Sequence, residues 1–189
     1  KLKDALAQRG AALCAVLPFA GHPTMAAAET LADQVRASSA DAVLGMGGGR
    51  ALDTAKAAAY LLGMPVYTLP TIAATCAAVS ALSVLYHPDG HLDRLLQLGE
   101  GPAHCLLDTG VIAASPAMYL RAGLGDTLAK HVEVPFSARG RALRHGDALG
   151  LSIAEGLYPA LMEHAAPALA EASRGEAGQH LTAATLCSV

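Results

Sequence analysis

The sequence has 189 residues, a formal net charge of −3, 53% hydrophobic residues and 15% charged residues. This composition excludes the class of disordered chains, and the length suffices for one domain, or for one domain and part of a second. Lys and Arg residues are scattered, so the sequence offers no basic surface for a nucleic acid or an anionic membrane, and we expect a small-molecule substrate.

The first half of the sequence alternates helical and strand-like patterns. Apolar residues at spacings of three and four mark the helices, and continuous apolar runs mark strands buried on both faces. Such alternation is typical of an α/β fold with a parallel sheet. The expected elements are helices at residues 1–9, 24–38 and 50–62, and strands at residues 12–19, 41–46 and 64–70.

A hairpin and one more strand follow. Two strand-like runs within residues 83–98 flank His87-Pro88-Asp89-Gly90, and Asp-Gly is a strong hairpin turn signal. We therefore expect an antiparallel hairpin added to the parallel sheet. Residues 104–112 predict a further strand and its exit.

Only helical patterns continue beyond this strand. Ser115-Pro116 is a favourable pair for the N-cap and first turn of a helix. Pro159 and Pro167 should break or kink the helices that follow. We therefore predict an α/β domain at residues 1–115 and the start of an all-helical domain at residues 116–189.

The four cysteines lie far apart without a C-x-x-C pair, which favours a reducing, cytoplasmic location over a disulfide framework or a zinc ribbon. The sequence contains no apolar run long enough for a membrane span. His145, His164 and His180 are expected at solvated helix positions. The chain begins without Met in a helical pattern and ends without a capping signal, so we expect a fragment of a longer protein. Its alanine-rich helical faces suggest a homo-oligomer.

The stretch GMGGGRALDTAK, residues 45–56, is typical of a strand, a glycine turn and the start of a helix. Backbone N–H groups at such a turn, together with the positive end of the helix, form a site for a pyrophosphate. A purely structural tight turn explains the same residues, and spacing alone does not decide between the two. Asp53 falls in the first helical turn, where the helix dipole favours a carboxylate in any case.

The stretch PTIAATCAAVSALSV, residues 70–84, consists mostly of small and hydroxyl-bearing side chains. It follows a strand of the expected parallel sheet, so it lies at the same carboxyl edge as the glycine turn, where ligands bind. Small residues there leave room for a flat ligand, and Thr71, Thr75 and Ser80 offer hydroxyl groups. A tightly packed connection explains the stretch equally well.

The stretch AGLGDTLAK, residues 122–130, places two glycines and Asp126 inside a helical pattern. Each glycine there costs about 1 kcal/mol relative to alanine, and an aspartate among apolar residues must be paired if it is buried. A metal ligand would explain Asp126, and so would a capping residue at a helix break. From these residues alone we favour the capping residue.

Taken together, GGGRALDTAK, PTIAATCAAVSALSV, the Asp-Gly hairpin, LLDTGVIAASP and AGLGDTLAKHVE resemble the iron-containing (group III) alcohol dehydrogenase family. The resemblance runs in order from about residue 43 to residue 133, and it is to the glycerol dehydrogenase and hydroxycarboxylate dehydrogenase branch. It implies a Rossmann-like domain followed by an all-helical, dehydroquinate synthase-like domain. It also implies NAD or NADP and a divalent metal, zinc or iron, which would act as a Lewis acid toward the substrate alkoxide.

The resemblance implies a role for each matching residue. Asp126 corresponds to the family's metal-binding aspartate, while the other metal ligands are histidines of a later A-H-x-x-H-N-type segment that this sequence does not contain. The pyrophosphate would bind Gly47, Gly48 and Gly49, and Asp53 would lie near the nicotinamide. The residues implied to line the cofactor groove are Thr71, Ala74, Ser80, Leu82 and Tyr86.

Cys76 departs from the glycerol dehydrogenase pattern. Those enzymes have an acidic residue in a T-D-A-P setting where this chain has Thr75-Cys76-Ala77-Ala78, and that carboxylate binds polyol hydroxyls. TIAATCAA is more similar to the hydroxycarboxylate dehydrogenases, and the loss of a negative charge suits an anionic substrate. We expect Cys76 to contact the substrate of an NAD(P)-dependent oxidoreductase that acts on a small 2-hydroxy acid or alcohol.

Other functions stay open at this point. Within the same fold, a glycerol or polyol dehydrogenase and a glycerol-1-phosphate dehydrogenase are alternatives, although a phosphate substrate would call for basic residues, and only Arg50 and Lys130 are candidates. A non-catalytic nucleotide-binding fragment is the alternative outside the enzymes. NAD and NADP are not distinguished, because the acidic residue that contacts the ribose would precede Lys1.

Overall fold

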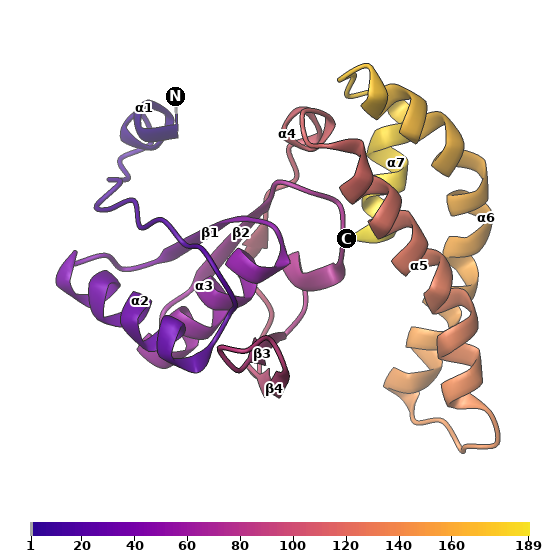
Figure 1. Ribbon diagram of the computed structural model, residues 1–189, viewed down its shortest axis with the longest axis horizontal. Coiled ribbons are helices and arrows are strands. Elements are labelled where there is room, and N and C mark those ends of the chain that lie inside the picture. The colour runs from indigo at the N-terminus through magenta and orange to yellow at the C-terminus, as the bar shows by residue number, and fades with distance from the viewer. Residues whose placement is uncertain (1) are drawn as a thin grey trace. The chain divides into compact units, whose positions relative to one another are not determined.

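The computed structural model describes residues 2–189, and the side chains from Lys3 onward; the Lys1 position of the first predicted helix lies outside the described residues. The chain divides into two compact units. Unit 1 comprises the residues up to Leu69 together with Val79–Leu106, and unit 2 comprises Pro70–Ala78 and Leu107–Val189. Figure 1 shows helices and strands in the first part of the chain and helices alone in the last part.

Unit 1 contains a parallel sheet and a separate hairpin. The three-stranded sheet has the order β1-β2-β5, and β2 pairs with β5 in parallel through Tyr67 opposite His104 and Thr68 opposite Cys105. The parallel sheet predicted from the alternating pattern is therefore present. The elements are α1 (Leu2–Ala7), α2 (Met25–Ala37), β1 (Val43–Gly47), α3 (Gly49–Leu62), β2 (Val66–Pro70), β3 (Leu82–Tyr86), β4 (Leu92–Gln97) and β5 (His104–Cys105).

Helix α3 is the centre of unit 1. It buries every residue from Leu52 to Ala59, and its small alanine side chains let neighbouring elements approach closely. On one side Ala55 and Ala59 pack with Val35 of α2 and Val43 of β1, and on another Ala57 packs with Leu85 of β3. The helix ends at Gly63, whose φ of +62° is the left-handed conformation expected of a C-cap.

The hairpin predicted from Asp-Gly is confirmed. Strands β3 and β4 pair in an antiparallel ladder from Leu82 opposite Gln97 to Tyr86 opposite Leu92, with an irregularity between Leu85 and Tyr86. Gly90 in the turn has a φ of +88°, which a glycine adopts without strain. The two strands form a sheet of their own, so the hairpin extends no strand of the parallel sheet.

Two predicted strands of unit 1 are wrong or shorter than expected. Residues 12–19 form no strand, because no described strand pairs with this segment to satisfy its backbone groups. Val16, in the middle of the segment, is 75% exposed. The strand expected at residues 104–112 ends at Cys105, because Asp108 starts a helix. Its Oδ1 accepts hydrogen bonds from the backbone N–H groups of Gly110, at 2.9 Å, and Val111, at 3.2 Å.

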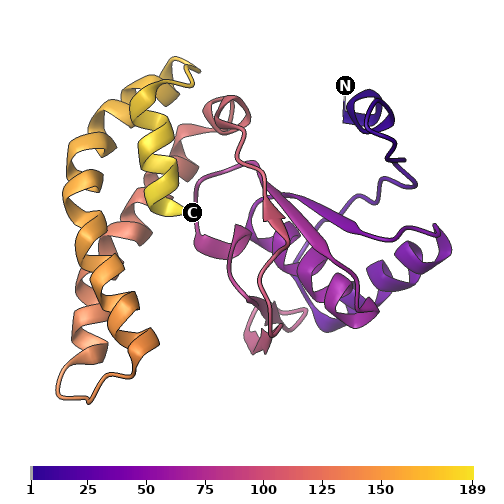
Figure 2. The same cartoon turned by 180° about the vertical axis from the view of Figure 1, so that it is seen from behind.

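Unit 2 is helical, and Figure 2 shows its long helices from behind. Its core includes Ala73, Ile112, Leu120, Leu161 and Leu181. Within the described residues, none of the helices is both long and apolar enough to cross a bilayer. The elements of the unit are the 3-10 turn η1 (Cys76–Ala78) and the helices α4 (Thr109–Ala113), α5 (Ala117–Ala138), α6 (His145–Ser173) and α7 (Gln179–Ser188).

Prolines affect these helices less than the sequence predicts. Pro116 occupies the N-cap of α5, and the Ser115 hydroxyl donates a hydrogen bond back to Ile112 O, at 2.7 Å, instead of capping α5. Pro159 and Pro167 lie inside α6 without breaking it. Figures 1 and 2 both show α6 as one curved helix, and a curved course is how a helix accommodates an interior proline.

The junction of α6 and α7 is made by polar groups. The Glu171 carboxylate accepts hydrogen bonds from the backbone N–H groups of His180, at 3.4 Å, and Leu181, at 2.7 Å, so it caps α7. The Nδ1 atoms of His164 and His180 lie 3.0 Å apart in a hydrogen bond, and both rings are partly buried. The prediction that these two histidines are solvated is therefore wrong, because contact between α6 and α7 covers them.

Candidate functional site

The glycine turn lies between β1 and the start of α3, as the sequence predicts. Gly47 has a φ of +150°, and a Cβ at this position would lie 2.8 Å from the Ala51 Cβ. Gly48 is the N-cap of α3 with an extended backbone, and no side chain caps the helix there. The first N–H groups of an α-helix have no partner within the helix, so this end of α3 offers donors and a positive dipole to an anion.

Gly45, which is not among the predicted pyrophosphate-binding glycines, sets the distance between β1 and α3. A Cβ at Gly45 would lie 2.8 Å from the Ala55 Cβ and 3.5 Å from Leu52 Cδ2. Distances below 3.0 Å force one of the two elements to move. Gly45 therefore permits close packing of the strand against the helix that carries the glycine turn.

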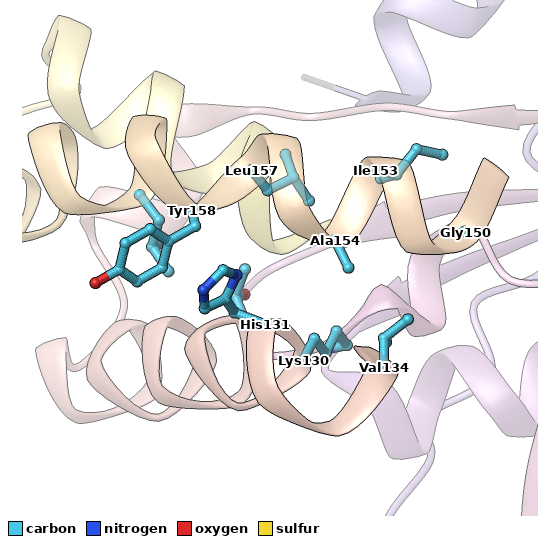
Figure 3. Close-up of a pocket in the computed structure, with 10 residues that line it drawn as sticks. Lys130, His131, Val134, Gly150, Ile153, Ala154, Leu157 and Tyr158 are labelled. Carbon is cyan, nitrogen blue, oxygen red and sulfur yellow. The ribbon is translucent and has the colours of Figure 1, made fainter. Parts of the chain in front are cut away.

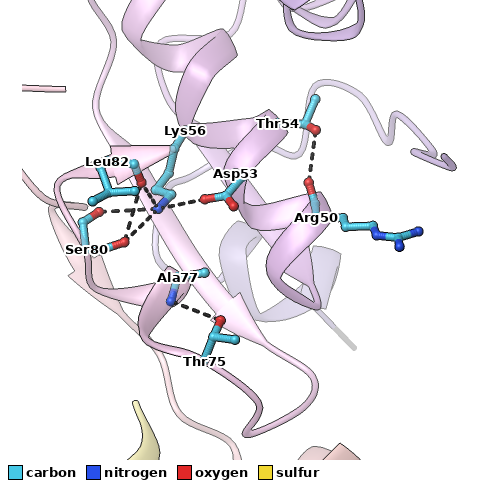
Figure 4. Close-up of polar contacts among 8 residues, drawn as sticks. All are labelled: Arg50, Asp53, Thr54, Lys56, Thr75, Ala77, Ser80 and Leu82. Atoms are coloured by element: carbon cyan, nitrogen blue, oxygen red, sulfur yellow. Dashed lines mark hydrogen bonds and ion pairs between the residues drawn. The ribbon is translucent and has the colours of Figure 1, made fainter. Parts of the chain in front are cut away.

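Asp53 is buried, and it belongs to the second turn of α3 because the helix begins at Gly49. The prediction of a first-turn carboxylate favoured by the dipole is therefore wrong. Its Oδ1 lies 3.1 Å from the Lys56 ammonium, in an ion pair shown in Figure 4. Burial raises the pKa of the Asp53 carboxyl above its ordinary value of 3.8, while Lys56 and the backbone of Val84 oppose that rise.

Lys56 was not among the predicted site residues, yet it is the largest fully buried side chain of the described chain. Its ammonium reaches the backbone carbonyls of Ser80 and Leu82 as well as Asp53. The available signal was an Asp and a Lys three residues apart on an otherwise apolar stretch of helix, and that signal does not reveal the distant partners.

The remaining predicted cofactor residues of unit 1 lie on one segment. Ser80 and Leu82 are at the entry to β3, and Tyr86 is its last residue. The Tyr86 N–H donates to Pro23 O, at 2.9 Å, and its ring centroid lies 6.2 Å from that of His22. The structure thus brings Asp53 into one polar cluster with Ser80 and Leu82 through Lys56.

The predicted residues from Thr71 to Cys76 belong to unit 2. Ala73 is fully buried in the helical core, whereas Cys76 is exposed in the turn η1. The Thr75 Oγ1 accepts a hydrogen bond from the Ala77 N–H, at 3.3 Å, and so helps to form this turn. Thr71 and Ala74 are partly buried on the same segment. The stretch is therefore a tightly packed connection at Ala73 and an open surface at Cys76.

Gly123 explains one of the two glycines in α5. A Cβ at Gly123 would lie 1.9 Å from the carbonyl oxygen of Ala73, whereas a Cβ at Gly125 would meet no atom within 4 Å. The backbone of α5 thus rests directly on the backbone of the Pro70–Ala78 segment. This contact places the predicted substrate residue Cys76 and the predicted metal residue Asp126 in the same compact unit.

Asp126 lies within an unbroken α5, so the interpretation of this residue as a cap at a helix break is wrong. Its carboxylate is 49% exposed and forms an ion pair with the Lys130 ammonium one turn later. Gly123 and Gly125 do not interrupt the helix, since a glycine keeps its backbone N–H and C=O groups and costs only about 1 kcal/mol relative to alanine.

A cavity of about 140 Å³ lies between α5 and α6 (Figure 3). Its walls are mainly apolar, and they include Lys130, Ile153 and Leu157. The His131 ring stacks on Tyr158 with centroids 4.1 Å apart and an interplanar angle of 19°. The buried His131 Nδ1 has no hydrogen-bond partner in the structure. No local pattern in the sequence predicts this cavity, since it depends on the pairing of two helices.

The order of these features, from the glycine turn to the first helix of unit 2, matches a known family. The family model described as "Iron-containing alcohol dehydrogenase" matches residues 1–109. The chain belongs to this family. The resemblance inferred from the five motifs is thereby confirmed for a new member of the iron-containing alcohol dehydrogenases.

Two curated dehydrogenases illustrate the similarity of this chain to known proteins. A glycerol dehydrogenase of Escherichia coli O6:H1 is 37% identical over 163 residues, which are 84% of this chain and 44% of that protein. Hydroxycarboxylate dehydrogenase A of Escherichia coli K12 is 38% identical over 157 residues, which are 81% of this chain and 42% of that protein. The chain spans about half the length of the curated relatives it matches.

The fold is shared with solved members as well. The crystal structure of a probable glycerol dehydrogenase from Sinorhizobium meliloti 1021 matches with a TM-score of 0.84 at 27% identity, over 99% of this chain and 54% of that one. The predicted fold class, a Rossmann-like α/β part with a parallel sheet followed by helices, is therefore confirmed.

The family implies a nucleotide and a metal, and the residues fit these two groups unequally. The glycine turn fits a pyrophosphate, because a Cβ at Gly47 would lie too close to the Ala51 Cβ and the start of α3 has no side-chain cap. Within residues 2–189, no three His, Cys, Asp or Glu side chains are grouped to hold a metal ion. Asp126 offers one oxygen ligand, so the described residues do not complete a metal site, and no step below passes through one.

Proposed function

We propose that this chain forms the nucleotide-binding part, and the start of the helical part, of an NAD(P)-dependent oxidoreductase. The reaction interconverts a small 2-hydroxy acid or alcohol and its carbonyl form. The observation that carries this proposal is the uncapped, glycine-lined start of α3 in a member of the iron-containing alcohol dehydrogenases. The proposed domains remain residues 1–115 and 116–189, with α5 beginning at Ala117.

The proposed cofactor site uses backbone groups for the pyrophosphate. Gly47, Gly48 and Gly49 would present N–H donors to the phosphate oxygens, and the dipole of α3 would add a favourable field. When bound, NAD(P) accepts or returns the hydride of the reaction. The further residues proposed to contact it are Asp53, Thr71, Ala74, Ser80, Leu82 and Tyr86.

Cys76 supports an anionic substrate. Its thiol is exposed on the η1 turn and carries no formal charge of its own, whereas the resemblance places a carboxylate here in glycerol dehydrogenases. A carboxylate substrate would be repelled by that negative charge, and it is not repelled by a neutral thiol. We therefore propose a 2-hydroxy acid as the preferred substrate, with Cys76 beside it.

Glycerol or another polyol is the second candidate substrate. The glycerol dehydrogenase and the hydroxycarboxylate dehydrogenase relatives are 37% and 38% identical to this chain, so overall similarity does not separate them. The discriminating experiment compares the oxidation of 2-hydroxybutyrate and glycerol by the complete gene product, loaded in turn with zinc and iron. A clear preference for glycerol would contradict the acid-specific proposal.

Cofactor binding is tested on the 189-residue chain itself. Titration calorimetry with NADH and NADPH should detect binding, and Gly48→Glu should abolish it, because a carboxylate would occupy the anion site at the start of α3. Glu29→Gln on α2 is a control outside the turn. Binding without turnover in the complete gene product would favour a non-catalytic nucleotide-binding protein. No binding of either cofactor would contradict the glycine-turn assignment.

The metal role of Asp126 is proposed from the resemblance. Asp126→Asn should lower the zinc or iron content of the complete gene product, as measured by elemental analysis, while Asp147→Asn on the exposed start of α6 should not. Equal metal content in both variants would contradict this role. The cytoplasmic location and the homo-oligomer remain predictions, the latter checked by light scattering.

A further inference from the structure

We propose that Lys56 is a positioning residue for the cofactor site. Its buried ammonium fixes the Ser80–Leu82 segment to the helix that carries the glycine turn. This role rests on the proposed function, since it concerns how NAD or NADP would be held. The structural link itself, from α3 to the entry of β3, stands on contacts within unit 1.

The first step of the argument is the burial and saturation of the ammonium. The Lys56 side chain has no exposed area. Its Nζ lies 2.5 Å from Leu82 O, 3.2 Å from Ser80 Oγ, 3.3 Å from Ser80 O and 3.1 Å from Asp53 Oδ1 (Figure 4). An ammonium has three N–H donors, so these oxygens use its whole capacity. Lys56 therefore has no donor to spare for a substrate or a cofactor.

The second step concerns the segment that Lys56 holds. Residues 79–81 belong to neither a helix nor a strand, and Leu82 is the first residue of β3. The carbonyls of Ser80 and Leu82 accept from Lys56, and the Ser80 hydroxyl lies between them at 3.4 Å from Leu82 O. The hairpin also holds this segment on its other side, where the Leu98 N–H donates to Ala81 O, at 3.0 Å. Lys56 adds the connection from the segment to α3, and it orients the hydroxyl proposed to face the cofactor.

The third step connects this segment with the pyrophosphate. Lys56 lies on α3, whose N-terminus is the glycine turn and whose residues Leu52–Ala59 are all buried. Close-packed neighbours around these buried turns resist displacement of the helix between the glycine turn and Lys56. The glycine turn and the Ser80–Leu82 segment are therefore held at a fixed separation. Asp53 balances the charge of Lys56 and keeps its ammonium in place.

A second pair in unit 1 shows that the spacing alone does not require burial. Asp33 and Arg36 on α2 have the same i,i+3 spacing, but their side chains are 76% and 62% exposed. Exposed pairs of this type add little stability. Burying the equivalent pair on α3 costs desolvation free energy, which additional hydrogen bonds must offset. In this structure those bonds run from Lys56 to Ser80 and Leu82, so the buried pair holds this segment.

The experiment compares variants of the 189-residue chain by NADH titration and by hydrogen exchange of the backbone amides at residues 79–84. Lys56→Met keeps the volume and removes the donors. Arg36→Met is the matched control at the exposed pair. Ala59→Gly destabilises the same helix without touching Ser80 or Leu82, so it controls for lost stability.

Lys56→Met should weaken NADH binding at least tenfold and speed amide exchange at residues 79–84, while exchange in α5 and α6 stays unchanged. Lys56→Gln, which keeps two donors without the charge, should give an intermediate result, and it serves where Lys56→Met does not fold. Both controls should bind NADH as the parent does. Unchanged exchange and affinity in a folded Lys56→Met or Lys56→Gln would overturn the proposal, and so would an equal loss of affinity in Ala59→Gly.

The two proposals fail separately. If the parent chain binds no NADH, the proposed cofactor site fails, and the exchange measurement alone decides whether Lys56 fixes the segment. Faster exchange at residues 79–84 in Lys56→Met would then support the link, and unchanged exchange would refute it.

Discussion

Helices α3 and α6 bury very different shares of their length. Helix α3 has 14 residues and buries eight in succession, whereas α6 has 29 residues and buries only Leu161, Ala168 and Ala172. Apolar side chains of α6 such as Ile153 and Met162 are more than half exposed. The proposed nucleotide-binding residues at the start of α3 therefore precede a run of eight buried residues, while the proposed metal and substrate residues of unit 2 lie at exposed positions. Packing around α3 should set the rigidity of the cofactor site.

Core truncation should separate the two helices most strongly. Leu52→Ala on α3 removes a side chain that is 2% exposed and should lower the free energy of unfolding of unit 1 by about 3 kcal/mol. Ile153→Ala on α6 should change the free energy of unfolding of unit 2 by less than about 0.5 kcal/mol. Urea unfolding monitored by circular dichroism measures both. Equal losses of unfolding free energy in the two variants would show that the difference in burial does not affect stability.

The two glycines of α5 sharpen the comparison within unit 2. Gly123→Ala places a Cβ 1.9 Å from the Ala73 carbonyl oxygen and should lower the free energy of unfolding by about 2 kcal/mol, because backbone must move. Gly125→Ala meets no atom and should raise it by up to about 1 kcal/mol through helix propensity. Thermal unfolding of both variants tests this. A stabilised Gly123→Ala would refute the close contact.

The α6–α7 junction predicts a smaller effect. A Cβ at Gly178 would lie 2.3 Å from the Glu171 carboxyl carbon, so Gly178→Ala should displace the carboxylate that caps α7 and cost about 1 kcal/mol. Gly175 offers no matched position, because its φ is +68°. Glu171→Gln, which keeps an acceptor, should cost less than Gly178→Ala in the same unfolding assay, and the reverse order would contradict the capping role.

The buried carboxyl of α3 predicts a pH dependence, the smallest effect considered. Since the folded pKa of Asp53 is raised, the folded chain binds this proton more tightly than the unfolded chain. The contribution to stability is present below the ordinary pKa of 3.8 and declines as the pH rises through the raised folded value. Asp53→Asn should remove this decline in urea unfolding curves measured as a function of pH. An identical slope in both proteins would contradict the burial argument.

Local signals in the sequence predict much of this fold. The apolar spacing locates α2 and α3, and Asp-Gly locates the hairpin, because in each case the information lies within a few neighbouring residues. The strand at residues 12–19 fails for the opposite reason. An apolar run becomes a strand only when another strand satisfies its backbone groups, and the run itself carries no information about that partner.

In the candidate site, too, features encoded by adjacent residues were predictable and features that depend on distant residues were not. The glycine turn follows from adjacent residues, and its position was predicted correctly. Lys56 was missed because its partners Ser80 and Leu82 lie 24 and 26 residues further along the chain. The reason for Gly123 was missed as well, since it depends on the backbone of Ala73, which the chain reaches only through the tertiary fold.

The Pro70–Ala78 segment has a consequence for dissecting this protein into parts. Because the chain enters unit 2 at Pro70, leaves it after Ala78 and returns at Leu107, the units are joined at three peptide bonds. A piece that stops at Leu106 would keep Pro70–Ala78 without the helices that bury Ala73. Such a piece would carry an unpacked segment. The proposed nucleotide-binding module is therefore better separated by replacing Pro70–Ala78 with a short polar link than by one cut.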